Sequence, residues 1–390
     1  MMSEFDTTGV VIDRREADRP GAHALIVGID DYPYLVGGSG ALSDHNLGLT
    51  QLSTAVPSAL AFHEWLVERA RLPVPLATSR LLLAPHEGWP QDLKIPPPAA
   101  LSGSTDDFLR AATGWMQAAR ESDAEMAIFY FCGQKLQLSS DDDVLLFQNF
   151  GSPLGPSFRG SVSFANIFNG MGPNERTIAQ SQVYFLDGSR HPVRRAALGS
   201  MLSGTTDVFD VLPTGPDRRM AGVFHGAAPG DQAYSLANSI SMFTQAVIKG
   251  LDGAAAVRQR GSEWEVTTSS LSRWLGIEGD RLASEHGLSI AFRANLLGDG
   301  VLTRVDAAPP VRVVIRMGPA AAAVNAELVI EDERGNRVSR FPDVGPPIHT
   351  VLPAGFYALS LVPKQESAKT SRRLIQVLPP VATIDMDEIV

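Results

Sequence analysis

Two kinds of hydrophobic pattern alternate along residues 21–305. Short continuous apolar runs are typical of strands that are covered on both faces, and apolar residues spaced three and four apart are typical of helices that bury one side. The runs that predict strands are residues 23–29, 80–85, 126–131, 143–148, 183–187 and 221–227, and helical spacing is found at 53–70, 105–119 and 239–251. Because strands and helices alternate, we expect an α/β fold with a mostly parallel sheet flanked by helices on both faces, an α/β/α sandwich.

Short polar side chains mark where the first two helices begin. Ser53 or Thr54 can cap the first helix, and Thr105 can cap the second, which has two aspartates in its first turn. The polar residues 1–20, which precede the first strand, are predicted to form a flexible arm.

Residues 311–390 follow a different pattern. Alternating, β-rich runs are separated by turn residues and have no helical period, which predicts a small C-terminal β-sandwich. The run VLPAGFYALSLVP resembles the hairpin of transthyretin-like and immunoglobulin-like modules, with its turn at Pro353 and Gly355 and with Tyr357 on the inner face. A second hairpin is predicted to turn at Gly335-Asn336. We expect an accessory docking domain whose removal leaves residues 1–305 folded.

Composition narrows the class of protein. The 390 residues are 44% hydrophobic, and the formal net charge of −10 is spread without a basic block, so we expect neither nucleic acid nor an anionic membrane as a partner. No apolar run approaches the roughly 18 residues that cross a bilayer. The single cysteine, Cys132, excludes an intrachain disulfide framework and a cysteine-rich metal site. We expect a cytoplasmic protein without a bound metal or cofactor.

The chemistry of a parallel sheet collects at the carboxyl ends of its strands. Six segments there and on the helices, HALIVGIDDYP, LSTAVPSALAFHEWL, MAIFYFCGQK, QVYFLDGSR, FHGAAPGDQAYS and MFTQAVIKGLDGAA, follow in the order found in bacterial caspase-like (metacaspase-like) cysteine peptidases. The segments WEVTTSSLSRWLG and GLSIAFRAN are similar to the last helix and strand of such domains. The resemblance covers residues 21–305 and implies a caspase-like domain.

The resemblance also implies a catalytic pair. Family members carry a histidine after the third strand and a nucleophilic cysteine after the fourth, because a thiol attacks an amide as the thiolate and an adjacent imidazole lowers its pKa. The matching positions here are Gln134 and Ser189. Gln exchanges no proton near neutral pH, and a serine hydroxyl without a base is a poor nucleophile. Ser58 matches a position that is often acidic in the specificity pocket, which would here contain Ser58 and Asp187.

These substitutions predict a catalytically inactive pseudopeptidase that binds proteins as a scaffold or adaptor. Relatives of such domains occur in bacterial defence, cell-death and secretion-associated systems. The alternative is a divergent hydrolase in which Ser189 is served by His225 or His191, since His225 ends the neighbouring strand and His191 lies two residues on. The oligomeric state stays open.

Two further features have a functional and a structural interpretation each. Cys132 is either a displaced nucleophile or a small buried apolar residue, and we favour the second. The run Asp141, Asp142 and Asp143 is either part of a calcium site or a solvated loop, and we favour the loop because calcium needs six to eight oxygen ligands from several positions.

Overall fold

The structure is a computed structural model, and it falls into two compact units. Unit 1 comprises residues 1–248 with 275–302, and unit 2 comprises residues 249–274 with 303–390. Unit 2 thus takes in residues 249–274, which the sequence analysis assigned to the first domain, and the boundary expected between 305 and 311 stays a prediction. The structure describes residues 9–16, 18–86, 101–138, 142–154, 158–173, 177–193, 205–209, 215–235, 239–258, 263–318, 326–343, 347–364 and 371–386.

Unit 1 is built on a seven-stranded mixed sheet in the order β1-β3-β2-β4-β8-β10-β13. The five central strands run parallel to one another, and the edge strands β1 and β13 are antiparallel to their neighbours. The predicted α/β fold is therefore confirmed. The strands are β1 (Val10–Asp13), β2 (Ala22–Ile29), β3 (Leu76–Ala84), β4 (Met126–Cys132), β8 (Ser181–Asp187), β10 (Met220–His225) and β13 (Arg293–Leu297).

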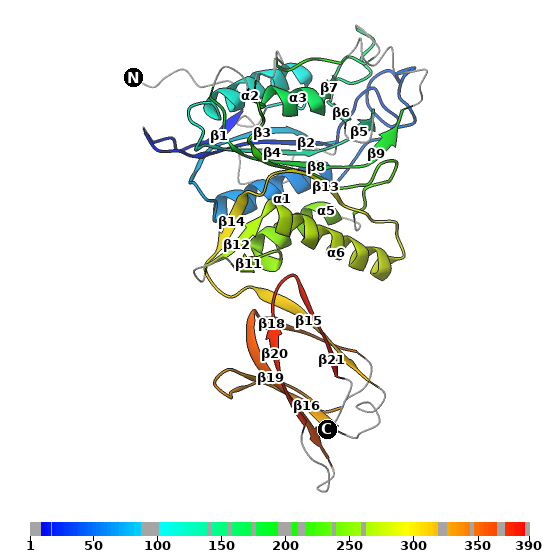
Figure 1. Cartoon of the computed structure of the whole chain (residues 1–390). Coiled ribbons are helices and arrows are strands. Elements are labelled where there is room, and N and C mark those ends of the chain that lie inside the picture. The colour runs from blue at the N-terminus through cyan, green and yellow to red at the C-terminus, as the bar shows by residue number, and fades with distance from the viewer. Residues whose placement is uncertain are drawn as a thin grey trace. The chain divides into compact units, whose positions relative to one another are not determined.

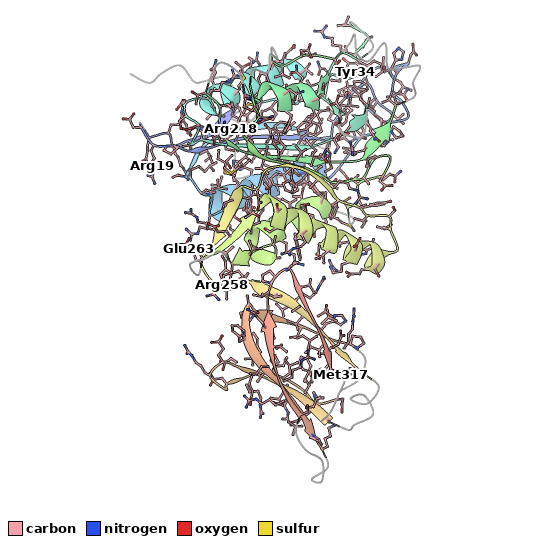
Figure 2. All side chains as sticks on the ribbon, viewed as in Figure 1. Arg19, Tyr34, Arg218, Arg258, Glu263 and Met317 are labelled. Atoms are coloured by element: carbon pink, nitrogen blue, oxygen red, sulfur yellow. The ribbon has the colours of Figure 1, made fainter. Side chains whose placement is uncertain are left out.

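Helices cover both faces of this sheet. In Figure 1, α2 and α3 lie on one face, and α1 and α5 on the other. Successive side chains of β4 point to opposite faces of the sheet, so they contact different helices. The ring centroid of Phe129 lies 6.3 Å from that of Phe108 in α2. The ring of Tyr130 stacks on that of Phe62 in α1, with 4.6 Å between their centroids. Side chains fill the space between the layers (Figure 2). The helices are α1 (Ala55–Glu68), α2 (Thr105–Ala118), α3 (Phe164–Gly170), α5 (Met242–Lys249) and α6 (Thr268–His286).

A glycine sets how closely α1 packs on the sheet. A Cβ at Gly28 of β2 would lie 2.7 Å from the Cβ of Ala59 and 2.9 Å from the carbonyl oxygen of Ala55. Any larger residue would push the helix away from the strand. The helix therefore begins directly above the carboxyl end of β2.

The caps of the first two helices differ from the prediction. Thr54 occupies the cap position of α1 without a side-chain bond, and the carboxylate of Asp30 instead accepts the N–H groups of Ala55, at 2.7 Å, and Val56, at 3.1 Å. In α2 the cap is Ser104, whose hydroxyl accepts the N–H of Asp107. A carboxylate accepts the N–H groups of a helix's first turn in stronger hydrogen bonds than a neutral hydroxyl does.

Two smaller elements complete unit 1. Residues 10–13, which the sequence analysis placed in a flexible arm, form the edge strand β1, because their backbone pairs with β3 although four residues are too few to show a period. Residues 1–8 and 17 of the predicted arm lie outside the described residues. A separate sheet has the order β7-β6-β5-β9, with β5 (Lys135–Gln137), β6 (Asp143–Leu146), β7 (Ser161–Ser163) and β9 (Arg190–Pro192).

Unit 2 is rich in strands. It holds the π-helical turn η3 and a short sheet of β11, β12 and β14, followed by sheets of order β18-β15-β21 and β17-β16-β19-β20. Strand β15 buries alternate residues, as the β-rich prediction required, whereas β19 buries five consecutive residues, Tyr357–Leu361. The bounds are η3 (Gly250–Ala254), β11 (Val257–Arg258), β12 (Trp264–Thr267), β14 (Val301–Val305), β15 (Pro310–Met317), β16 (Ala326–Asp332), β17 (Arg337–Phe341), β18 (Ile348–Pro353), β19 (Gly355–Pro363), β20 (Ser371–Val377) and β21 (Val381–Met386).

One of the two predicted hairpins is present. Strands β16 and β17 pair around a turn closed by the bond from the N–H of Gly335 to the carbonyl of Asp332. The hairpin predicted at Pro353 and Gly355 is wrong: β18 pairs with β15, and β19 pairs with β16 and β20. The chain there passes from one sheet to the other, and the hydroxyl of Tyr357 donates to the carbonyl of Pro353 across the corner.

Among the helices with described residues, none is both long enough and apolar enough to span a bilayer.

Candidate functional site

The carboxyl ends of β4 and β8 meet at a small pocket of about 200 Å³. Cys132 and Asp187 are opposite one another in these neighbouring strands, so the loops that follow them run side by side. A Cβ at Gly188, whose φ is +113°, would lie 2.2 Å from the carbonyl oxygen of Gly133, so this close approach requires glycine. The pocket lining includes both Gln134 and Ser189. The structure thus brings together the two positions that the sequence analysis singled out.

Gln134 is held on both its backbone and its side chain. Its N–H donates to the hydroxyl of Tyr32 at 2.7 Å, and its Nε2 donates to the carbonyl of Thr50 at 3.0 Å. The side chain is buried, with 5% of its surface exposed. The amide of Gln134 thus links the loop after β4 to the segment that precedes α1.

Ser189 is half-buried, and its hydroxyl accepts the N–H of Ala233 at 2.9 Å. His191 lies in β9 and is half-buried, and burial lowers its pKa. His225 ends β10 and is 1% exposed. Within the described ranges, no hydrogen bond joins the Ser189 hydroxyl to either histidine. The residues proposed for a hydrolase are therefore near in sequence or topology without forming a hydrogen-bonded set.

Asp187 is fully buried at the end of β8 and is satisfied from within the protein. Its carboxylate accepts the hydroxyls of Ser241 and, at 2.7 Å, Thr244, and also the N–H of Gly188 at 2.8 Å. Ser58 is also fully buried, and its hydroxyl accepts the N–H of Ser241 at 2.9 Å. Ser58 thus fixes the backbone of Ser241, which lines the pocket. The carboxylate of Asp187 is bonded to Thr244 of α5.

Cys132 is buried, as the structural interpretation predicted, with 4% of its surface exposed. Burial, together with the nearby negative charge of Asp187, raises the pKa of the Cys132 thiol well above its usual value. A thiol that stays protonated near neutral pH is a weak nucleophile. Cys132 therefore fills space at the end of β4.

A buried group of charged side chains lies at the ends of β5, β6, β9 and β10, and sequence reasoning missed it. Asp143 is fully buried; its Oδ1 accepts Nε of Arg190 at 2.8 Å, and its Oδ2 lies 3.3 Å from Nδ1 of His225 and 3.9 Å from Nζ of Lys135. The ammonium of Lys135 also donates to the carbonyl of Leu186 at 2.8 Å. We call these four residues, Lys135, Asp143, Arg190 and His225, the buried charge cluster.

The solvated-loop interpretation is wrong for Asp143. Asp143 opens β6, and the apolar residues that follow it draw it into the interior. Asp142 accepts the N–H of Ala165 at the start of α3, and Asp141 lies outside the described residues. The one signal in the sequence was the position of the aspartate directly before a buried strand.

The electrostatics of the cluster follow from burial and mutual attraction. Burial would raise the pKa of Asp143, but the close contact with His225 and the charges of Lys135 and Arg190 lower it to about 2. Burial lowers the pKa of both His225 and Lys135. In the part of the chain that the structure describes, no group of three or more His, Cys, Asp or Glu side chains has an arrangement that could hold a metal ion.

Comparison with known proteins adds little to this geometry. No family model matches the chain, and no curated protein matches its sequence. The solved structure of protein GSU0716 from Geobacter sulfurreducens is similar over 71% of this chain and 93% of its own, at 10% identity and a TM-score of 0.41. The Bacillus anthracis TIE protein is similar over 26% of this chain and 21% of its own, at 16% identity and a TM-score of 0.18. Because both TM-scores are low, neither likeness bears on the chemistry of the pocket.

Proposed function

We propose that this chain is a caspase-like pseudopeptidase that acts by binding another protein. The observation that carries the proposal is the shared pocket of Gln134 and Ser189 at the ends of adjacent parallel strands, β4 and β8. These are the places where the resemblance to caspase-like peptidases puts a histidine and a cysteine. Each of the two side chains is bonded to a backbone group, at Thr50 and Ala233.

The chemistry of these side chains suits binding rather than bond cleavage. An amide offers no proton exchange near neutral pH, and a serine hydroxyl needs a base within hydrogen-bond reach to attack a carbonyl. The nearby Asp187 accepts four hydroxyl or N–H donors from the protein itself. The pocket is therefore suited to neutral polar groups, which fits a residual groove for a peptide segment.

One observation favours a second candidate, a hydrolase using Ser189 with His225. His225 lies 3.3 Å from a carboxylate oxygen of Asp143, which is how an acid orients a catalytic imidazole. Two features weigh against it. The ring of His225 is buried, and neither of its nitrogens has a hydrogen-bond partner among the described residues, the Asp143 carboxylate and the Ser189 hydroxyl included. A histidine that acts as the base for Ser189 must lie within hydrogen-bond distance of its hydroxyl.

The proposal places the protein in the cytoplasm as an adaptor with a protein partner, in a bacterial defence, cell-death or secretion-associated system. The strand-rich unit 2 would add docking surface to it. Neither nucleic acid nor a membrane is a proposed partner, because the net charge is −10 and is not gathered into a basic block.

The test is proteolysis of a broad peptide library, analysed by mass spectrometry. We expect no cleavage above background by the wild-type protein or by Ser189→Ala. Ser235→Ala is the matched control, because Ser235 lines the same pocket and the substitution also removes one serine hydroxyl. Cleavage by wild type and by Ser235→Ala that disappears in Ser189→Ala would overturn the proposal in favour of the hydrolase.

A further inference from the structure

The edge strand β13 combines three features that point to a binding site away from the strand-end pocket. Its backbone pairs with β10 on one side, and it ends the seven-stranded sheet on the other. Alternate residues of an antiparallel edge strand direct their N–H and C=O groups away from the partner strand, where another chain can take them. No described residue of unit 1 pairs with this outer side of β13.

An apolar pocket lies beside this edge. Its volume is about 410 Å³, and its walls include Phe164 and Phe168 of α3, Val223 of β10 and Leu297 of β13. Asp217 also lines it, and its carboxylate is paired with Arg219 at 2.7 Å. Asn295 of β13 also lines it, and Asn295 is opposite Val223 in the ladder. Asn295 and Leu297 are two residues apart, so both point to the α3 side of the sheet. We call this space the β13 pocket.

A positive charge lies on the same side of the strand. Arg293 is exposed, is four residues from Leu297 and shares its face. Among residues with described positions, no acidic side chain forms an ion pair with it. A partner strand beside β13 would therefore meet an apolar pocket at one end and an unpaired guanidinium at the other.

We propose that β13 binds an extended segment of another protein, which adds a strand to the sheet. The segment carries a large apolar side chain that enters the β13 pocket and an acidic side chain, about four residues away on the same face, that pairs with Arg293. Backbone hydrogen bonds to the free edge supply part of the affinity, and the pocket with the charge supplies the choice of sequence. This proposal rests on the proposed function in one respect: the partner is another protein. It adds the surface that the partner binds and the kind of segment that binds there.

The site is separate from the strand-end pocket, so the two proposals can fail separately. The β13 pocket shares no lining residue with the pocket of Gln134 and Ser189. A peptidase assay reports on Ser189, whereas peptide binding at β13 depends on α3 and the sheet edge. Cleavage activity would overturn the pseudopeptidase proposal and leave the β13 proposal standing.

The experiment is selection of binders from a displayed library of random peptides about nine residues long, enough to span the strand. Selected peptides are then measured against the full chain and its variants. Ala165→Trp fills the β13 pocket from α3, and Arg293→Glu reverses the charge. Thr113→Trp is the matched control, because it places the same side chain on an exposed position of α2. Thermal melts establish that each variant is folded.

We expect peptides that pair an apolar residue with an acidic one about four positions away. Their affinity should fall at least about tenfold on Ala165→Trp and on Arg293→Glu and stay unchanged on Thr113→Trp. A peptide with lysine in place of its acidic residue should regain binding to Arg293→Glu. Should Ala165→Trp fail to fold, the charge exchange at Arg293 decides the question alone.

Three results would overturn the proposal. The first is a selection without binders, and the second is a set of binders that treat Ala165→Trp and Arg293→Glu as they treat the wild type. The third is a dimer in sedimentation experiments that Arg293→Glu dissociates, which would mean that a second copy of the chain occupies the edge.

Discussion

Replacing Asp143 by asparagine tests the buried charge cluster most directly. The substitution keeps the shape of the side chain and removes its charge, so that the cations of Lys135 and Arg190 stay buried without their carboxylate. Both cationic side chains are at most 2% exposed, so water has little access to screen them. Removing one partner of a buried ion pair costs about 3–5 kcal/mol, and we expect Asp143→Asn to lower the free energy of unfolding by that amount.

The measurement is urea unfolding followed by tryptophan fluorescence. Asp13→Asn is the matched control, because Asp13 pairs with Arg15 on the surface of the same unit, with side chains 44% and 46% exposed. An exposed pair contributes under about 1 kcal/mol. If Asp143→Asn destabilised the protein no more than Asp13→Asn, the cluster would not be the buried ionic anchor described above.

The same variant has a pH signature. The pKa of Asp143 is about 2 in the folded protein against an ordinary value of 3.8, so its ionisation contributes about 2 kcal/mol of stability. Because the folded pKa is the lower one, this stability is fully present above about pH 4 and is lost as the pH falls towards 2. The advantage of the wild type over Asp143→Asn should therefore shrink by about 2 kcal/mol in that window. An unchanged difference between pH 5 and pH 2 would contradict the assignment.

Three more predictions concern helix α1 and the strand-end pocket. Asp30→Ala should destabilise the protein by about 1–2 kcal/mol in urea, and Asp30→Asn by less, because one amide oxygen can still cap the helix. Burial lowers the pKa of His63 to about 4, so stability falls from pH 7 to pH 4, and His63→Leu should gain about 2 kcal/mol on wild type between pH 8 and pH 5. Gln134→His should speed iodoacetamide labelling of Ser189→Cys about tenfold; equal rates would show that the two side chains do not meet.

Local sequence patterns predicted much of the sheet and missed what depends on distant residues. The run 126–131 read as a strand because every residue in it is apolar, and β4 is buried throughout. Asp143 was misread because its partners are Lys135, Arg190 and His225, and no local pattern encodes contacts across such separations. The wrong hairpin had the same cause, since turn residues at 353–355 do not specify which strand the chain pairs with next.

The pairing of Gln134 with Ser189 came from the resemblance to caspase-like peptidases. The two residues line one pocket at the carboxyl ends of the parallel neighbours β4 and β8. Their hydrogen bonds to Thr50 and Ala233 were beyond sequence reasoning, because backbone acceptors and donors look alike at every position. The pocket beside β13 left no local trace either, since its walls come from three separate elements.

The cap of α1 has a consequence for the order in which the chain folds. Helix α2 carries its cap next to its own first turn, at Ser104, and can begin to form as a local event. Helix α1 receives its cap from Asp30, which is 25 residues earlier and at the end of β2. The first turn of α1 is therefore completed only after that strand has come to rest beside it, and a peptide of residues 53–70 should be less helical than one of residues 103–120. We therefore expect strand β2 and the first turn of α1 to form in the same folding step, although a loop separates them along the chain.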